Sequence, residues 1–239
     1  MRVGAAAAAG GLYEYPLFDV AGLSNTTPRF REQLVSGSMA HGYNPDYIAT
    51  LISVESGFNP KAASNSSSAR GLLQWLSSTF PAVAARARMN ITHAEVTSLS
   101  ATEQLPLVFA YLDGTVLKSL GDKATVGDYY MAVFMPAYVG KEADFIVGQK
   151  NAMGPTPSGQ SLAAVYAANP GLDRNQDGKI TVWDVETTAR LAYQEAAGKP
   201  RVAVRIVPYD PFADSGASQR YLYLALAGAG AFLVWRWYK

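Results

Sequence analysis

The chain has 239 residues, of which 49% are hydrophobic and 16% are charged, and its formal net charge is +1. This length and apolar content are enough for a folded domain with a hydrophobic core and for additional segments. The near-neutral charge argues against an electrostatic nucleic-acid binder, which carries a basic patch or stripe. Because cysteine is absent, disulfides and thiolate metal sites are excluded. His41 and His93 form no HExxH zinc motif, and we expect packing or surface roles for both.

The first half of the chain has a helical pattern after a short leading segment. Residues 1–28 contain an alanine run that is too weakly apolar and too rich in glycine for a good signal peptide, so we expect a flexible or partner-bound arm. From residue 28 to about residue 147 the periodicity is helical and strand alternation is nearly absent. One helix places five apolar side chains on a single face: Leu105, Val108, Phe109, Leu112 and Val116.

A polar loop between two helical stretches follows the breaker sequence GPTPSG, within residues 153–198. Its sequence DRNQDGKITVWD has the spacing of an EF-hand calcium loop, with Gly178 at the sharp turn. The predicted calcium ligands are Asp173, Asn175, Asp177, the Lys179 carbonyl, Thr181 and Asp184. The final aspartate is shorter than the usual glutamate, so affinity should be weaker. A metal-free polar turn is the alternative, and with one loop visible we expect a structural role for the calcium.

The chain ends in an apolar stretch. Residues 199–219 predict a short strand and a linker, and residues 220–239 follow with fifteen uncharged residues from Tyr221 to Trp235. A membrane span needs about 17–25 residues, but Arg220 and Arg236 can snorkel and so extend this one. Aromatic residues at both ends match interfacial belts. We predict a transmembrane helix, with a helix buried in a partner protein as the alternative. Positive charge is heavier after the span, which weakly favours a non-cytoplasmic catalytic part.

One acidic residue, Glu55, stands where an amphipathic helix should carry an apolar side chain. Apolar residues precede it at helical spacing, namely Ile48, Leu51 and Ile52. Signals for the start and the end of a helix flank it, namely Asn44 and Pro45, then Gly57 and Pro60. Glu55 should therefore lie on the last turn, at the rim of a core.

A carboxyl group on the apolar side of a helix loses solvation, which raises its pKa toward neutrality. Such a group can donate a proton at working pH, as cleavage of a glycosidic bond requires. The alternative is that Glu55 curls outward from the helix end and caps the helix or forms an ion pair. Periodicity alone does not decide between the two.

The residues that follow Glu55 form an ordered series of motif positions. They are Glu55, Ser56, Asn59, Pro60, Ser64, Ala69, Gly71, Leu72, Gln74, Thr79 and Phe80. This stretch of 26 residues, 55–80, resembles the lysozyme-like lytic transglycosylase family, of the soluble lytic transglycosylase type. A looser resemblance extends from about residue 30 to about residue 150.

The resemblance implies that Glu55 is the sole acid and base. It would protonate the bond between N-acetylmuramic acid and N-acetylglucosamine and then deprotonate the muramic C6 hydroxyl, which closes a 1,6-anhydro ring without consuming water. Ser64 would bind the N-acetyl or lactyl group, with Ser67 and Ser68 as alternatives, and Gln74 would line the floor of the cleft. A hydroxyl-rich loop can also be a solvated turn.

The sequence departs from the family at the third motif. The family often has Ala-Tyr-Asn-Ala-Gly there, with a tyrosine that reaches the catalytic glutamate, whereas this chain has AVFMPAYVG. Phe134 takes the tyrosine position, as in some phage-type relatives, and Tyr138 is a second candidate for the cleft. We expect the departure to affect the rate and the pH optimum more than the reaction class.

Together these patterns predict a mainly α protein with an arm at residues 1–28. The arm is followed by a lysozyme-like transglycosylase domain (29–152) and an EF-hand-like helix-loop-helix unit (153–198). After these come a linker with a short strand (199–219) and a transmembrane helix (220–239). We expect a membrane-anchored peptidoglycan lytic transglycosylase in a phage virion that opens the wall during genome entry, without a nucleic-acid partner. Cellular envelope machinery would use the same parts. The alternatives are a catalytically idle glycan-binding or structural protein that contacts other virion proteins, and a muramidase hydrolase.

Overall fold

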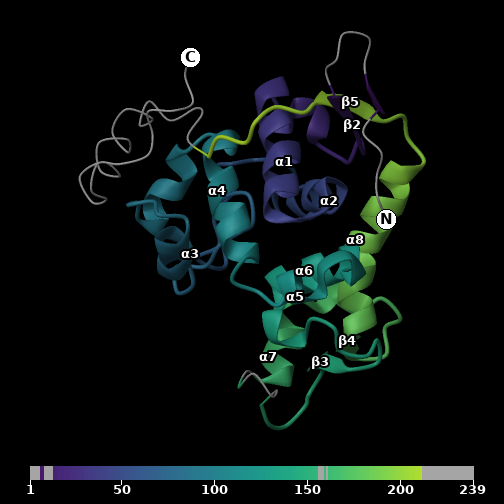
Figure 1. Ribbon diagram of the computed structural model, residues 1–239. Helices are drawn as coiled ribbons and strands as arrows, with labels where there is room; N and C mark the ends of the chain where they lie inside the picture. Colours follow the sequence, from purple (N-terminus) through teal and green to yellow (C-terminus); the bar gives the residue numbers. More distant parts are fainter. Residues whose placement is uncertain (1–5, 8–12, 156–158, 160, 212–239) are drawn as a thin grey trace.

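The computed structural model describes residues 6–7, 13–155, 159 and 161–211, and the fold is mainly helical (Figure 1). The α-helices are α1 (Pro28–His41), α2 (Pro45–Ser56), α3 (Phe80–Arg86), α4 (Ala101–Leu112), α5 (Leu117–Leu120), α6 (Val126–Phe134), α7 (Leu162–Ala168) and α8 (Val182–Ala197). The strands are β1 (Ala6–Ala7), β2 (Tyr13–Leu17), β3 (Ile146–Gln149), β4 (Lys179–Thr181) and β5 (Val202–Arg205). Short 3-10 turns lie at Leu23–Asn25, His93–Ser98, Gly121–Lys123, Pro136–Tyr138 and Pro170–Leu172.

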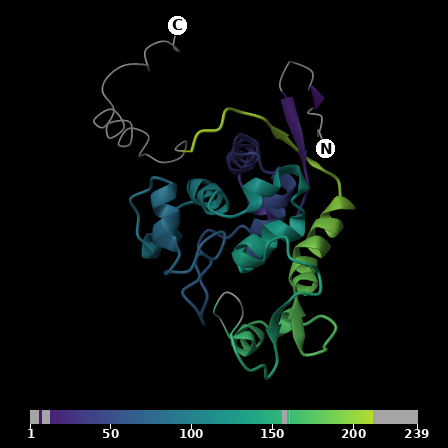
Figure 2. The same ribbon diagram turned by 60° about the horizontal axis from the view of Figure 1, so that its bottom comes forward.

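Helix α2 lies at the centre of the packing. It contacts α1, α6 and α8, while α1 also packs on α4, and α3 packs on α4 from the outer side (Figures 1 and 2). The apolar residues that predicted the α2 face, Ile48, Leu51 and Ile52, are at most 1% exposed. They belong to the main hydrophobic cluster, which also takes in Phe30 and Leu34 of α1. The helical periodicity of the sequence therefore corresponds to a packed core.

A second hydrophobic cluster joins the predicted transglycosylase domain to the helix-loop-helix unit. Met131 and Tyr138 from one side pack with Val165, Ile180 and Val185 from the other. Strand β4 pairs antiparallel with β3, and α6 packs along α8. The boundary predicted between residues 152 and 153 thus runs through a shared core. Before the boundary, β3 and α6 each pack against an element that lies after it, β4 and α8 respectively.

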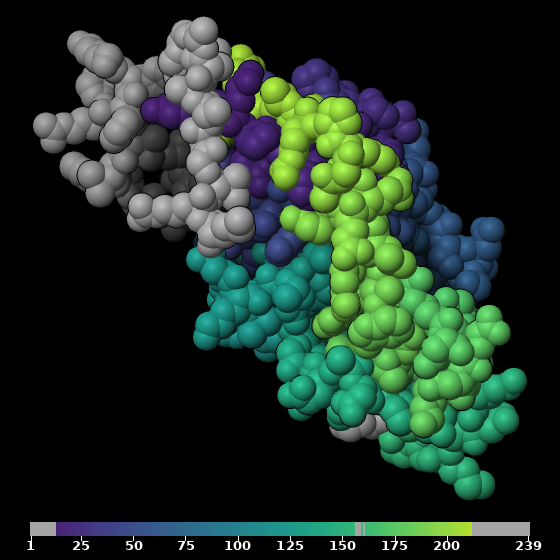
Figure 3. All heavy atoms as spheres, turned by 90° about the vertical axis from the view of Figure 1, so that its right-hand side faces the viewer, coloured from purple at the N-terminus to yellow at the C-terminus, as the bar shows by residue number. Residues whose placement is uncertain are grey.

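Helix α8 connects the two clusters. Val185, near its beginning, is buried in the second cluster, and Ala196, at its end, is buried in the main one. Figure 3 shows α8 and β5, in light green to yellow-green, running over one face from the helix-loop-helix unit up to the N-terminal strand. A helix of 16 residues is about 24 Å long, which is enough to contact both cores.

The segment predicted as a flexible or partner-bound arm is built into the fold from Tyr13 onward. Strand β2 pairs antiparallel with β1 and with β5, so that Tyr15 lies opposite Val204 and Leu17 opposite Val202. Leu17 is fully buried and Tyr15 is 4% exposed. The prediction of an arm is wrong for these residues, because their partner strand lies nearly 190 residues later in the chain and local periodicity does not reveal it.

Asp46, in the first turn of α2, binds two other parts of the chain to that helix, namely the N-terminal segment around β2 and the residue before β5. Its carboxylate accepts hydrogen bonds from the Phe18 N–H (2.8 Å) and from the Tyr15 hydroxyl (3.0 Å). A guanidinium nitrogen of Arg201 lies 3.6 Å from the same carboxylate, and the guanidinium carbon lies 3.6 Å from the centre of the Phe18 ring. Desolvation raises the pKa of Asp46. The acid remains compatible with burial because all of these donors surround it.

Both histidines have structural contacts. His41 Nδ1 lies 2.9 Å from Asp113 Oδ2, and its ring stacks on Phe109 with a centroid distance of 4.9 Å. His93 Nε2 lies 2.9 Å from the carbonyl oxygen of Trp75. These contacts agree with the packing roles that we expected.

The short strand predicted in the linker is present as β5. The predicted transmembrane helix at residues 220–239 lies outside the described residues. Among the helices that the structure describes, none combines the length and the apolar character that a membrane crossing requires.

Candidate functional site

Glu55 lies on the last turn of α2, as the sequence predicts. The Asn44 side chain caps the start of the helix by accepting the Asp46 N–H, and Pro45 is the first helical residue. The helix ends at Ser56, and Gly57 caps it with a left-handed backbone (φ 58°) that suits glycine and with an N–H that donates to the Ser53 carbonyl. These local signals place Glu55 in the last turn of a helix whose apolar residues Ile48, Leu51 and Ile52 are buried in the core.

The N-terminal segment also braces this end of α2. The Ser53 hydroxyl donates a 2.7 Å hydrogen bond to the Ala21 carbonyl. Gly22 has φ +85°, and a Cβ added to it would lie 2.8 Å from the Gly57 carbonyl oxygen, so a side chain cannot be accommodated without movement. The backbone that carries Glu55 is therefore held at the helix start through Asp46 and at the helix end through Ser53 and Gly57.

Desolvation raises the pKa of Glu55 from 4.5 to about 7. The side chain is partly exposed, yet protein atoms surround it closely. Among the described residues, no group forms a hydrogen bond or an ion pair with its carboxyl. The alternative is that Glu55 curls outward to cap the helix or to form an ion pair. In the described part of the chain, its carboxyl has no partner for either interaction. Near neutral pH both the acid and the carboxylate are populated.

Two tyrosines lie within electrostatic range of Glu55. Burial, and then the charge of Glu55, raises the pKa of Tyr111 to about 12. Burial and the same charge raise the pKa of Tyr130, while the charge of Arg174 lowers it. Tyr111 comes from α4 and Tyr130 from α6, so the chemical surroundings of Glu55 are assembled from three helices. We refer to Glu55, Tyr111 and Tyr130 as the Glu55 site.

Gln104 fixes the motif loop that follows Glu55, although it is not among the site residues predicted from the sequence. Its amide nitrogen donates to the carbonyls of Pro60 (2.8 Å), Val96 (2.9 Å) and Leu99 (3.3 Å), and its Oε1 accepts the Leu72 N–H (2.9 Å). The side chain is fully buried. A glutamine within an otherwise apolar helical face was the available signal, because a buried amide has to satisfy several hydrogen bonds.

The polar residues predicted to bind substrate have mainly local contacts. The Ser64 hydroxyl accepts the N–H groups of Ser66 and Ser67, which closes its own loop, and the Ser68 hydroxyl accepts the Ser77 N–H. Gln74 Nε2 donates to the Gly71 carbonyl. Within the described part of the chain, no hydrogen bond joins these side chains to Glu55. Their substrate contacts remain predictions.

The two aromatic candidates of the third motif have different surroundings. Phe134 is partly exposed and stacks on Tyr130, with a centroid distance of 6.4 Å and an interplanar angle of 17°. Tyr138 is 1% exposed and packs against Phe145 in the second hydrophobic cluster. Burial leaves Tyr138 no surface for a glycan, so its place in the cleft is a correction to the sequence prediction. On α6, the residue on which the charge of Glu55 acts is Tyr130, one helical turn before Phe134.

The predicted calcium loop has the expected turn. Gly178 has φ +82°, and the Asp173 carboxylate accepts the N–H groups of Asp177 (3.1 Å) and Gly178 (2.9 Å). Although desolvation alone would raise the pKa of Asp173, the hydrogen bonds from Tyr166 and from backbone amides lower it. The loop therefore stabilises a carboxylate at its first position.

At the end of the loop, the predicted ligands Thr181 and Asp184 cap α8. Asp184 Oδ2 accepts the backbone N–H and the hydroxyl of Thr181 (2.9 and 2.6 Å). The oxygen donors of the loop suit a hard cation. Within the described residues, however, no three His, Cys, Asp or Glu side chains are gathered closely enough to hold a metal ion. Calcium would require Asp184 to give up part of its capping interaction.

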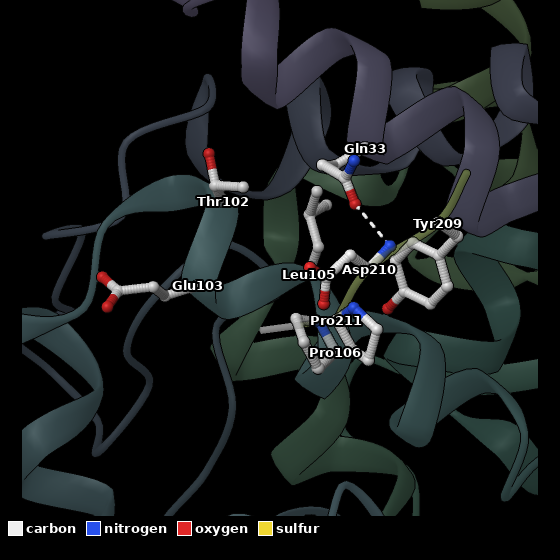
Figure 4. A pocket seen from close by; sticks show the side chains of 8 residues that line it. All are labelled: Gln33, Thr102, Glu103, Leu105, Pro106, Tyr209, Asp210 and Pro211. Carbon is white, nitrogen blue, oxygen red and sulfur yellow. Dashed lines mark hydrogen bonds between the residues drawn. The ribbon is translucent and has the colours of Figure 1, made fainter. Parts of the chain in front are cut away.

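A small cavity of about 10 Å³ lies away from the Glu55 site, between α1, α4 and the C-terminal segment (Figure 4). Gln33, Leu105 and Tyr209 are among its lining residues. Gln33 Oε1 accepts the Asp210 N–H, while its buried amide nitrogen has no hydrogen-bond partner among the residues that the structure describes. This volume accommodates about one water, which would satisfy that nitrogen. The cavity is too small for a sugar.

Comparison with known protein families agrees with the motif analysis. Residues 36–119 match a family model described as the transglycosylase SLT domain. The match begins within α1, contains Glu55 and Gln104, and ends within α5, before α6. It covers about a third of the chain. A comparison with curated proteins finds no match.

Replacing Glu55 with Gln should change how the free energy of unfolding depends on pH. Since the pKa of Glu55 is about 7 in the folded protein and 4.5 ordinarily, the folded state keeps this proton over a window in which the unfolded chain loses it. Wild-type stability should fall by about 3 kcal/mol as the pH rises from 4.5 to 7, and the variant should lack this loss.

Urea denaturation between pH 4 and pH 8.5 measures this difference. Above pH 7 the variant should be the more stable protein, and below pH 4.5 this advantage should vanish. Two curves that run parallel over the whole range would show that the Glu55 carboxyl is not desolvated.

Proposed function

We propose that this chain, which carries a transglycosylase SLT domain over residues 36–119, is a peptidoglycan lytic transglycosylase that uses Glu55. The SLT domain implies that peptidoglycan is the substrate, because members of that family are lytic transglycosylases. The observation that supports the residue assignment is the desolvated carboxyl of Glu55, with a pKa of about 7, inside the matched region. Asp46 is also desolvated and lies in the matched region, but its carboxylate accepts hydrogen bonds from the Phe18 N–H and the Tyr15 hydroxyl, whereas no group among the described residues bonds to the Glu55 carboxyl.

In the proposed reaction, the protonated Glu55 gives its proton to the oxygen between N-acetylmuramic acid and N-acetylglucosamine. The bond from the muramic C1 to that oxygen breaks, and N-acetylglucosamine leaves with a free 4-hydroxyl. The Glu55 carboxylate then takes the proton of the muramic C6 hydroxyl while O6 bonds to C1. The result is a 1,6-anhydro ring, and Glu55 regains its proton. One carboxyl serves both steps because the nucleophile belongs to the substrate.

Glu55→Gln should abolish the release of soluble fragments from purified sacculi, by at least 10³-fold, because the amide can neither give nor take the proton. Mass spectrometry of wild-type digests should show anhydro-muropeptides. Glu142→Gln is the matched control, since it removes an exposed carboxylate by the same substitution and should keep wild-type activity.

The outcomes separate the alternatives. Fragments with reducing ends would indicate a muramidase hydrolase. No release by the wild-type protein would indicate a glycan-binding or structural protein in which Glu55 is idle. Full activity of Glu55→Gln would contradict the assignment of Glu55.

We further propose that residues 220–239 anchor the protein in a membrane and that it acts in a virion during local penetration of the wall. The support is the uncharged stretch between two aromatic-rich ends and the phage-type third motif. A chain that lacks residues 220–239 should leave the membrane pellet after an alkaline wash, while the full chain stays there. Recovery of the full chain in cell envelopes and its absence from purified virus particles would favour cellular envelope machinery.

Calcium binding by the loop around Asp177 is a separate proposal, supported by the oxygen donors and the turn at Gly178. At a calcium concentration 100 times the dissociation constant, the folded state should gain about 2.7 kcal/mol. The melting temperature of the wild-type protein should therefore rise by several degrees in millimolar calcium and return to its starting value with a chelator. Asp177→Asn, at an exposed ligand position, should reduce the rise. An unchanged wild-type melting temperature would count against occupancy.

A further inference from the structure

Tyr130 occupies the position where the two hydrophobic clusters meet beside Glu55. It lies on α6, which packs against α2 on one side and α8 on the other. Its ring contacts both clusters, and its stacking on Phe134 fixes the ring plane. The aromatic part of Tyr130 is thus held by packing, while its hydroxyl remains available for a polar contact.

The hydroxyl groups of Tyr111 and Tyr130 differ in their partners. The Tyr111 hydroxyl donates a 3.1 Å hydrogen bond to the Ala132 carbonyl and so ties α4 to α6. Over the described ranges, no protein group forms a hydrogen bond with the Tyr130 hydroxyl, and none forms one with the Glu55 carboxyl. A desolvated carboxyl and a desolvated phenol therefore lie within electrostatic range of each other, and neither has a hydrogen-bond partner in the described part of the chain.

Polar groups in partly buried positions rarely remain without hydrogen bonds, so water or a ligand completes both of these. A sugar offers donors and acceptors on neighbouring atoms and can satisfy a carboxyl and a phenol at the same time. Burial and then the charge of Glu55 raise the pKa of the Tyr130 hydroxyl, and the positive charge of Arg174, from the helix-loop-helix unit, offsets part of that rise. A nearby positive charge makes a phenol a stronger hydrogen-bond donor.

We propose that the Tyr130 hydroxyl donates a hydrogen bond to the glycan at the bond that Glu55 cleaves, and that it is a second catalytic residue. This inference rests on the proposed function of Glu55. The group carries no proton away during the reaction. It stabilises negative charge on an oxygen of the sugar or of the Glu55 carboxylate as the proton is transferred. Its place on α6 lies beyond the region that matches the family model.

Tyr130→Phe tests this proposal because it removes the hydroxyl and keeps the ring on Phe134. A hydrogen bond to a charged or developing centre corresponds to about 10- to 100-fold in rate, so kcat on purified glycan strands should fall by that factor. KM should change by less than about threefold, since the bond is strongest in the transition state. The falling limb of the kcat–pH profile should also move to higher pH, because the carboxyl of Glu55 loses a polar neighbour.

Tyr193→Phe is the matched control. Tyr193 is a partly exposed tyrosine on α8 whose ring packs on Phe18 and Tyr47, away from the Glu55 site, so kcat should stay at the wild-type value. If Tyr130→Phe melts at a lower temperature than the wild type, the assays are run below its transition, where the variant is folded and kcat still decides.

The outcomes are distinct. An inactive Glu55→Gln together with a Tyr130→Phe that keeps kcat within twofold of wild type would overturn the role of Tyr130 and leave the proposed function intact. An active Glu55→Gln would overturn both. A fall in kcat with an unmoved pH profile would show a structural role alone and would also overturn the proposal.

Discussion

The structure of the site depends on one constraint, a carboxyl group held against an apolar core with no compensating partner among the described residues. Such a group is expensive to ionise, so the folded protein keeps Glu55 protonated well above the ordinary pKa of glutamate. The helix that carries it must resist turning the carboxyl outward. That resistance comes from three apolar residues on the core face of α2 and from the cap at Asn44. It also comes from the contacts that Asp46, Ser53 and Gly57 make with the N-terminal segment.

The two ends of the described chain therefore belong to the architecture of the site. Strands β2 and β5 close on each other beside α2, and Asp46 contacts both the segment after β2 and Arg201 before β5. Helix α8 runs from the helix-loop-helix unit to the paired strands β2 and β5, and it contributes core residues to both clusters. Through α8, the helix-loop-helix unit is in this way joined to the core that packs against α2, the helix of Glu55. Arg174, from the same unit, brings its positive charge into range of Tyr130.

Features that depend on local sequence could be predicted, and those that depend on distant partners could not. The bounds of α2 and the position of Glu55 followed from capping residues and periodicity, and the turn at Gly178 followed from loop spacing. Strands β2 and β5 are far apart in the sequence. The pattern of residues 13–17 therefore does not indicate which segment they pair with. Tyr138 and Tyr130 illustrate the same limit. Both lie near the third motif, but only tertiary packing decides that Tyr138 is buried and that Tyr130 reaches the Glu55 site.

The central claim is that the carboxyl of Glu55 titrates near neutrality in the folded protein, and carbon-13 NMR of glutamate-labelled protein measures this directly. The Glu55 carboxyl resonance, identified by its absence from the spectrum of Glu55→Gln, should titrate with a midpoint near 7. A midpoint near 4.5, the ordinary value for glutamate, would contradict the account, because the group could then no longer act as an acid at neutral pH.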